Sequence, residues 1–377
     1  MVADAARALV VGIDAREVQG RQTGTGRYLR NLVREWTRAG PDRLVAYFDG
    51  PVPAQPLLDH PRICRRPLGT GRTPGPVWQQ ILLPRAAEQD SLDVFFSPAY
   101  TCPLRLGAPR VTAVHDLAYF SCPQDFPLGH AVRRRALVAS SVHASRRILA
   151  CSEFTRREIA ARFPTVADRV VHVPLGPDDD LPPAPPRSEA RRRLGLAGPF
   201  LITVGSIFRR RCLPELLRAT ARLRRRHPDV TLDVVGEDRT APPLDLAGLT
   251  RRLGLEAAVR FSGFVDEAGL ADRYAAADAA VFLSDYEGFG LPALEAASRG
   301  VPLLVSERPA LGEVFAEAAW LVDPRDEGAI AAALDRLLGD PILRDRLRER
   351  GRALAARFSW SRTAALTRDA LVAAASP

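Results

Sequence analysis

The sequence predicts an α/β protein made of two doubly wound domains that face each other across a cleft. Its 377 residues are too many for one ordinary core and suit two domains. Short apolar runs alternate with amphipathic stretches along the whole chain, a pattern typical of βαβ units around a parallel sheet. A proline-rich break near the middle is followed by a second series of the same pattern. In such sheets ligands bind beyond the carboxyl ends of the strands.

The first domain is expected at residues 1–175. Its short apolar runs predict buried strands at residues 8–13, 44–48, 94–96, 111–114, 148–150 and 170–173. Between them, amphipathic patterns predict helices that include residues 27–38 and 131–147.

Residues 176–198 are expected to form an interdomain linker, because they open with one glycine, three aspartates and five prolines. The second domain is expected at residues 199–357. Strands are predicted at residues 200–204, 232–235, 259–261, 280–283 and 303–305, and helices at 213–226, 268–277 and 291–299. The last residues, 358–377, have an amphipathic helical pattern.

The composition is that of a globular protein, with 46% hydrophobic and 26% charged residues. The formal net charge is +9, and all 53 basic residues are arginine. This charge fits a solvated arginine-rich surface, an anionic substrate, an anionic membrane face or nucleic acid. The aromatic content of 7% and the lack of a recognisable RNA- or DNA-binding motif argue against a specific nucleic-acid binder.

The five cysteines are scattered and none forms a C-x-x-C pair, so neither a zinc site nor a disulfide framework is expected. The N-terminus lacks a signal-peptide layout, and no run reaches the roughly 18 apolar residues that span a bilayer. We therefore expect a cytoplasmic protein with at most peripheral membrane contact.

The most informative segment spans residues 281–300 and reads as a strand, a glycine-containing turn and a helix. Gly288 and Gly290 allow the backbone to approach a ligand closely, and Pro292 suits the first helical turn. The free amides there would form an anion site, with Glu287 at its mouth and Glu295 one turn into the helix. Taken alone, the two glutamates could equally be a helix N-terminal acid and a surface acid.

The complete string Glu287-Gly-Phe-Gly-Leu-Pro-Ala-Leu-Glu295 resembles the E-x7-E signature of retaining GT-B glycosyltransferases of family 4. The resemblance implies that Glu295 contacts the donor ribose. It also implies that Glu287 contacts and positions the donor sugar as a catalytic residue. The loop expected to contact phosphates and sugar hydroxyls consists of Gly288, Phe289, Gly290 and Leu291.

A second segment follows the strand at residues 200–204. Gly205 and the cluster that includes Arg210 and Arg211 suit a diphosphate, although three adjacent arginines could also be an exposed basic turn. Members of the resembled family usually carry Arg-Lys-Asn here. This chain has Arg211 in place of the lysine and Cys212 in place of the asparagine.

Three further segments match the family. His115 and Asp116 follow a predicted strand, and the resemblance places His115 near the transferred sugar and Asp116 beside it. By itself, a histidine there could be purely structural. The resemblance also assigns Gly24, Gly26 and Arg27 to the acceptor and phosphate side. It places Phe264 and Val265 near the nucleobase.

These matches imply a metal-independent glycosyltransferase without a cofactor. It would transfer a hexose from a GDP- or UDP-sugar to a glycan or lipid-linked acceptor, with GDP-mannose weakly favoured. The basic helix predicted at residues 131–147 could contact a membrane surface, or could simply be solvated. Two alternatives remain: a sugar-nucleotide epimerase on the same fold, and a non-enzymatic polyanion-binding protein.

Overall fold

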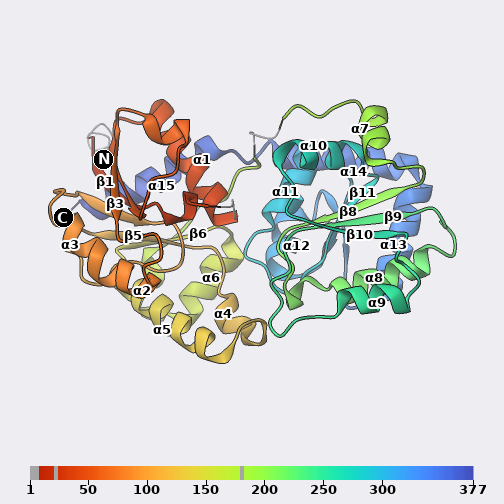
Figure 1. Ribbon diagram of the computed structural model, residues 1–377, viewed down its shortest axis with the longest axis horizontal. Coiled ribbons are helices and arrows are strands. Elements are labelled where there is room, and N and C mark those ends of the chain that lie inside the picture. Colours follow the sequence, from red (N-terminus) through yellow and green to blue (C-terminus); the bar gives the residue numbers. More distant parts are fainter. Residues whose placement is uncertain (1–7, 21–23, 179–181, 377) are drawn as a thin grey trace. The chain divides into compact units, whose positions relative to one another are not determined.

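The computed structural model describes residues 8–20, 24–178 and 182–376, and the chain divides into two compact units (Figure 1). The first unit comprises Met1–Leu117, Val132–Gly176 and Ser359–Pro377, and the second comprises Ala118–Ala131 and Pro177–Phe358. Each unit contains one parallel sheet with helices packed against it, which confirms the predicted α/β class.

The first unit is built on a seven-stranded sheet in the order β3-β2-β1-β4-β5-β6-β7, and every neighbouring pair is parallel. Its strands are β1 Val10–Asp14, β2 Arg43–Asp49, β3 Ile63–Leu68, β4 Val94–Ser97, β5 Arg110–Val114, β6 Arg147–Ala150 and β7 Val170–His172. The central strands consist almost entirely of buried apolar residues, as expected where helices cover both faces of a parallel sheet.

The second unit is built on a six-stranded parallel sheet in the order β10-β9-β8-β11-β12-β13. Its strands are β8 Phe200–Val204, β9 Thr231–Val235, β10 Val259–Gly263, β11 Ala279–Phe282, β12 Leu303–Ser306 and β13 Ala319–Val322. In Figure 1, α8 and α9 lie on one side of this sheet and α7 and α10 on the other.

Amphipathic helices cover both sheets. In the first half of the chain they are α1 Gly24–Ala39, α2 Gly75–Val77, α3 Leu83–Ala87, α4 Ala118–Ser121, α5 Leu128–Ala144 and α6 Glu153–Arg162. In the second half they are α7 Arg187–Leu194, α8 Leu213–Leu223, α9 Leu246–Arg252, α10 Glu267–Ala276, α11 Leu291–Ser298, α12 Pro309–Phe315, α13 Glu327–Gly339, α14 Pro341–Ala355 and α15 Trp360–Ala375. A π-helical turn, η3 Trp78–Leu82, connects α2 and α3. Short 3₁₀ turns are η1 Arg16–Val18, η2 Pro56–Asp59, η4 Pro123–Asp125, η5 Pro164–Arg169 and η6 Arg209–Arg211.

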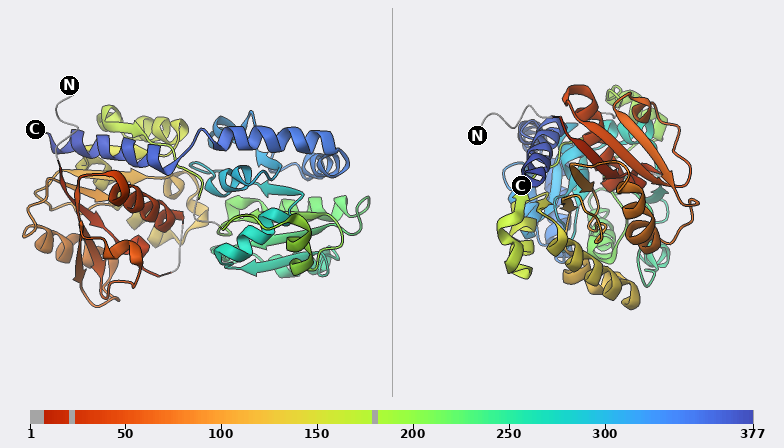
Figure 2. Two further views of the ribbon diagram at one scale, coloured as in Figure 1. Left: turned by 90° about the horizontal axis from the view of Figure 1, so that it is seen from above. Right: turned by 90° about the vertical axis from the view of Figure 1, so that its left-hand side faces the viewer.

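The C-terminal helix α15, dark blue in Figure 2, packs on α1 and on strands β4, β5 and β6 of the first unit. The indole N–H of Trp36 on α1 donates to the carbonyl oxygen of Ala364 at 3.1 Å, and Trp360 is buried. The last segment of the chain is therefore part of the first unit's core.

Strand order reverses direction once in each sheet, between β1 and β4 and between β8 and β11. The connections that follow the two strands on either side of such a point lead to opposite faces of the sheet. The gap between them is where doubly wound sheets bind ligands.

Some elements differ from the sequence-based prediction. Strands β3 and β13 were not predicted: the exposed Arg65 and Arg66 interrupt β3, and β13 is a short, mostly half-buried apolar run at a sheet edge. The predicted helix at 131–147 is α5, which begins earlier and ends at Ala144, because Arg147 already belongs to β6. The range 176–198, expected to be a linker, contains α7, which packs on α10.

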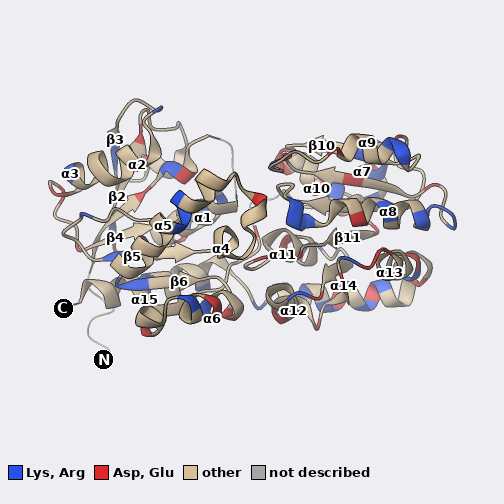
Figure 3. Ribbon diagram, turned by 90° about the horizontal axis from the view of Figure 1, so that it is seen from below, with Lys and Arg blue, Asp and Glu red and all other residues tan. Residues whose placement is uncertain are grey.

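Arginine and acidic residues are interspersed along helices such as α8, α13 and α14 (Figure 3). In the described part of the chain, no helix combines the length and apolar character needed to cross a membrane. Nor do those residues include a group of three or more histidine, cysteine or acidic side chains able to hold a metal ion. All five cysteines are free thiols.

Candidate functional site

The predicted donor-binding residues gather at the point where the second sheet changes direction. Strand β8 ends at Val204 and leads through Gly205 to the arginine turn η6, whereas β11 leads to the loop that carries Glu287 and then to α11. Because β8 and β11 are neighbours, the two loops meet at the carboxyl edge of the sheet.

Arg211 joins these two loops. Its Nη1 donates to Oε1 of Glu287 at 3.4 Å, and its Nη2 donates to the carbonyl oxygen of Val204 at 3.1 Å. The guanidinium carbon lies 3.8 Å from the ring centroid of Phe282. Burial lowers the pKa of Arg211, while the carboxylate of Glu287 opposes this shift. The result is a poorly hydrated cation, which interacts strongly with any anion that reaches it.

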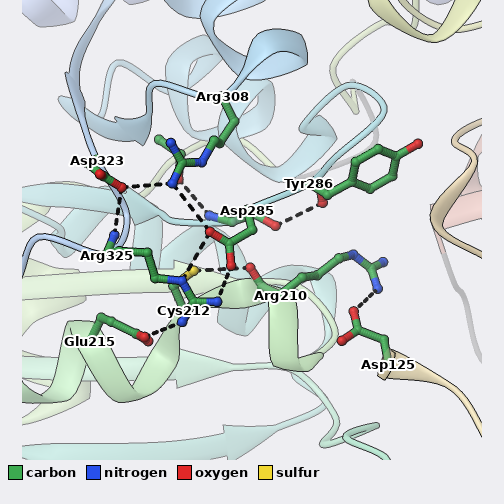
Figure 4. Close-up of polar contacts among 11 residues, drawn as sticks. Asp125, Arg210, Cys212, Glu215, Asp285, Tyr286, Arg308, Asp323 and Arg325 are labelled. Carbon is green, nitrogen blue, oxygen red and sulfur yellow. Dashed lines mark hydrogen bonds and ion pairs between the residues drawn. The ribbon is translucent and has the colours of Figure 1, made fainter. Parts of the chain in front are cut away.

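Arg210 points to a different partner. Its Nη1 donates to Oδ2 of Asp125 at 3.0 Å, and both side chains are buried (Figure 4). Asp125 lies in the segment Ala118–Ala131, which packs with the second unit. The sequence did not predict this pairing, because 85 positions separate the two residues.

Two glycines with positive φ allow close packing at this edge of the sheet. A Cβ atom at Gly205, where φ is +124°, would lie 3.3 Å from Nη1 of Arg211. Gly290 has φ of +93° as the residue before α11, and a Cβ atom there would lie 2.6 Å from the side chain of Leu311. Only glycine fits either position without displacing a neighbour.

The remaining residues of the predicted donor site are also placed on this edge. Glu287 is partly accessible on the loop, whereas Glu295 is buried on α11. Phe289 is buried and packs edge-on against Phe358, with ring centroids 5.7 Å apart. Leu291 begins α11, where Pro292 has no N–H and the amide of Ala293 donates to the carbonyl oxygen of Gly290 at 2.9 Å, so the predicted anion site depends on the amides that precede Pro292.

An ion network around Asp285 connects this loop with its neighbours (Figure 4). Arg325 contacts the carboxylates of both Asp285 and Glu215, and its Nε–Oδ1 distance to Asp285 is 3.2 Å. Arg308 bridges Asp323 at 2.9 Å and Asp285 at 3.6 Å. These contacts connect the loops after β11, β12 and β13 with the first turn of α8.

Cys212 lies within this network as the residue before α8. Its φ of +47° and ψ of +36° are left-handed, and its side chain makes no capping hydrogen bond. The thiol donates to the carbonyl oxygen of Arg210 at 3.3 Å, and burial raises the pKa of Cys212. The amide of Asp285 donates to the same carbonyl at 2.8 Å, which fixes the arginine turn to the β11 loop.

The residues predicted near the nucleobase follow β10. Phe264 is exposed and Val265 half-buried, just before α10. The amide of Gly236 donates to the carbonyl oxygen of Gly263 at 2.8 Å, so the loops after β9 and β10 are joined. An exposed aromatic ring at this edge is available to contact a planar ligand.

His115 lies in the first unit, immediately after β5. Its Nε2 lies 2.8 Å from the carbonyl oxygen of Pro98. The rings of Tyr28 and Tyr100 approach it edge-on, with centroids 4.8 Å and 5.7 Å away. Burial lowers the pKa of His115, although its bond to Pro98 opposes this shift. Burial therefore favours the neutral form of the ring.

The other residues predicted for the acceptor side also belong to the first unit. Asp116 is half-buried next to His115. Gly24, Gly26 and Arg27 form the first turn of α1, where Gly26 is buried and Arg27 half-buried. Gln22 and Thr23, which belong to the same motif, lie outside the described residues.

The profile of glycosyl transferases group 1 matches residues 187–354, and that of glycosyltransferase family 4 matches residues 22–181. O-antigen chain mannosyltransferase B of Escherichia coli is 33% identical to the chain over 275 residues, which cover 71% of each protein. The chain belongs to the group 1, family 4 glycosyltransferases.

Two further comparisons agree. A D-inositol 3-phosphate glycosyltransferase of Kineococcus radiotolerans is 35% identical over 246 residues, which cover 60% of this chain and 57% of that protein. Sucrose-phosphate synthase of Thermosynechococcus elongatus superposes with a TM-score of 0.79 at 22% identity, covering 96% of this glycosyltransferase and 98% of the synthase. The latter match shows that the fold is GT-B.

Within each unit, the structure brings together most of the predicted residues of this glycosyltransferase. Sequence reasoning missed the supporting residues Asp125, Asp285 and Arg325, and it also missed Tyr100. Asp285 lies within the segment 281–300, but the string does not indicate its ion pairs, and the other three residues belong to no local motif. Their partners are distant in sequence, so only the fold reveals them.

Proposed function

We propose that this glycosyltransferase transfers a hexose, with mannose favoured, from a nucleoside diphosphate sugar to a glycan or lipid-linked acceptor, with retention of anomeric configuration. The observation that carries the proposal is the ion pair between the buried Arg211 and the partly accessible Glu287, which lies on the loop that leads into α11. It sets a cation for the diphosphate next to a carboxylate for the sugar hydroxyls. The similarity to an O-antigen mannosyltransferase supports mannose and a polysaccharide acceptor.

In this reaction the acceptor oxygen bonds to the anomeric carbon while the bond from that carbon to the diphosphate breaks. The acceptor proton goes to the leaving phosphate. Negative charge grows on the diphosphate, and Arg211 and the backbone amides of Gly290 and Leu291 stabilise it without a metal ion. Arg211 is effective because its surroundings are already desolvated and fixed before the donor arrives.

A lipid-linked acceptor would require access to a membrane surface. Helix α5 offers two exposed apolar side chains, Leu128 at 79% and Val132 at 56%, beside the exposed Arg133 and the half-buried Arg135. Such a surface suits the headgroup region of an anionic bilayer. Binding to vesicles that contain anionic lipid, compared with neutral vesicles, tests this part of the proposal.

Donor binding is tested by thermal stabilisation of the purified protein with GDP, UDP, ADP and their sugar conjugates, each in the presence of EDTA. We expect one nucleotide to raise the melting temperature. Glu295→Gln should abolish that rise, because it removes a buried carboxylate on α11. Glu313→Gln on α12 is the matched control and should retain it. A wild-type protein that no nucleotide stabilises would contradict the donor site.

A further inference from the structure

Tyr100 has a backbone conformation that tyrosine rarely adopts. Its φ is +59°, and the amide of Thr101 donates to the carbonyl oxygen of Ala99 at 2.5 Å. A hydrogen bond from residue i+2 to residue i, around a central residue with positive φ, is the rare and strained form of γ-turn. The amide of Tyr100 itself donates to Ala113 on β5 at 2.8 Å. Strain of this kind persists only where the surroundings enforce it, and such residues cluster at ligand sites.

The π-helical turn η3 enforces the conformation. Nε2 of Gln79 donates to the carbonyl oxygen of Thr101 at 3.0 Å, and Nε2 of Gln80 donates to that of Cys102 at 3.0 Å. Two adjacent side chains thus hold the residues that follow Tyr100. Single π-helical turns are frequent at functional sites, because they redirect side chains that an α-helix would place elsewhere.

The strained turn lies where a ligand is expected. It follows β4, which pairs with β1 at the point where the first sheet changes direction. At the end of β1, Arg16 forms two hydrogen bonds with Asp14, at 2.9 Å and 2.6 Å, and Gln79 donates to the same carboxylate at 3.2 Å. Polar contacts therefore join the loop after β1 to the loop after β4. The rings of Tyr100 and His115 lie next to each other at this place.

His115 presents a hydrogen-bond acceptor at this place. The carbonyl oxygen of Pro98 can only accept, so the Nε2 atom that faces it carries the proton. Nδ1 of the neutral ring then holds a lone pair. A hydroxyl group can donate to that nitrogen while the carbon face of its sugar ring lies on a neighbouring aromatic side chain.

We propose that the ring of Tyr100 is the platform on which the acceptor sugar stacks, with a sugar hydroxyl donating to Nδ1 of His115. The assignment rests on the proposed function, since it takes the acceptor to be a sugar. The strained turn fixes the position of this ring before the sugar binds.

The test compares Tyr100→Gly, Tyr100→Phe and Ser91→Gly. Ser91 is exposed and also has a positive φ, +47°, but it precedes the N-terminal end of β4, whereas Tyr100 follows the C-terminal end. Ser91→Gly therefore relieves the same kind of backbone strain far from the proposed sugar site. Sugar binding is followed by saturation-transfer NMR with methyl α-D-mannoside, methyl α-D-glucoside and methyl α-D-galactoside. Thermal unfolding and stabilisation by nucleotides are measured in parallel.

We expect wild type, Tyr100→Phe and Ser91→Gly to bind at least one of the three glycosides. Tyr100→Gly should lose about tenfold in affinity, since it removes an aromatic contact. Its melting temperature should stay level or rise, because glycine adopts positive φ without strain. Stabilisation by nucleotides should be unchanged in every variant.

Three results would overturn the proposal: no glycoside bound by wild type, equal binding by Tyr100→Gly, or a fall in melting temperature that accounts for its loss of binding. Failure of the donor proposal is distinguishable. In that case nucleotides would not stabilise wild type, while glycoside binding would still depend on Tyr100.

Discussion

At the scale of single residues, Cys212 shows a conflict between side chain and backbone. Its left-handed backbone suits asparagine, which adopts positive φ far more readily than most other residues. We expect Cys212→Asn to raise the free energy of unfolding by about 0.5–1 kcal/mol, because the amide can also donate to the carbonyl oxygen that the thiol now contacts. Urea denaturation measures the change.

Cys102→Asn is the matched control for that prediction. Cys102 is also fully buried and its thiol also donates to a carbonyl oxygen, that of Ser141 at 3.7 Å, but its φ is not left-handed. There the same exchange should destabilise the protein, since it buries a larger polar group without relieving strain. If both variants lost stability equally, the backbone argument for Cys212 would be wrong.

At the scale of elements, the fold was predictable wherever a segment carried its own signal. The strand, turn and helix from β11 to α11 were predicted because their glycines, proline and glutamates lie within one short string. Strands β3 and β13 were not, because two exposed arginines interrupt β3 and because a short apolar run such as β13 does not by itself identify a strand. The ion pairs of Arg210 with Asp125 and of Arg325 with Asp285 could not be predicted either, because 85 and 40 positions separate the partners and no local sequence pattern marks them.

The ion network around Asp285, which holds the loop after β11, leads to a second prediction about elements. Arg325→Gln leaves the carboxylates of Asp285 and Glu215 without their shared cation. We expect the loop to move, and nucleotide affinity in the thermal-shift titration to fall about tenfold, because donor contacts depend on Glu287 and its neighbours.

Arg226→Gln is the control for the network prediction. Arg226 forms an exposed ion pair with Asp335 on the second unit, and such pairs contribute roughly 0–1 kcal/mol. Nucleotide affinity should remain that of wild type. A loss of affinity in Arg226→Gln equal to that in Arg325→Gln would show that general charge, rather than loop position, controls binding.

At the scale of the whole molecule, the chain leaves its first unit, forms the second, and returns with α15 to complete the first. Arg368 on α15 forms two hydrogen bonds with the buried carboxylate of Asp42, at 2.7 Å and 3.0 Å, across 326 positions of sequence. The same carboxylate accepts from the amide of Leu9 at 3.0 Å, just before β1. The first core is therefore complete only when the last helix has docked.

Arg368→Met tests this closure. Removing one partner of a buried ion pair leaves an uncompensated charge, so we expect a loss of about 3 kcal/mol in the unfolding of the first unit. Three of the four tryptophans, Trp36, Trp78 and Trp360, lie in that unit, so tryptophan fluorescence reports chiefly its transition. Nucleotide stabilisation of the second unit should persist.

The exposed Arg362 on the same helix supplies the control, since Arg362→Met should change the free energy of unfolding by at most about 0.5 kcal/mol. Equal losses in both variants would mean that α15 is held by its surface charge rather than by the buried pair.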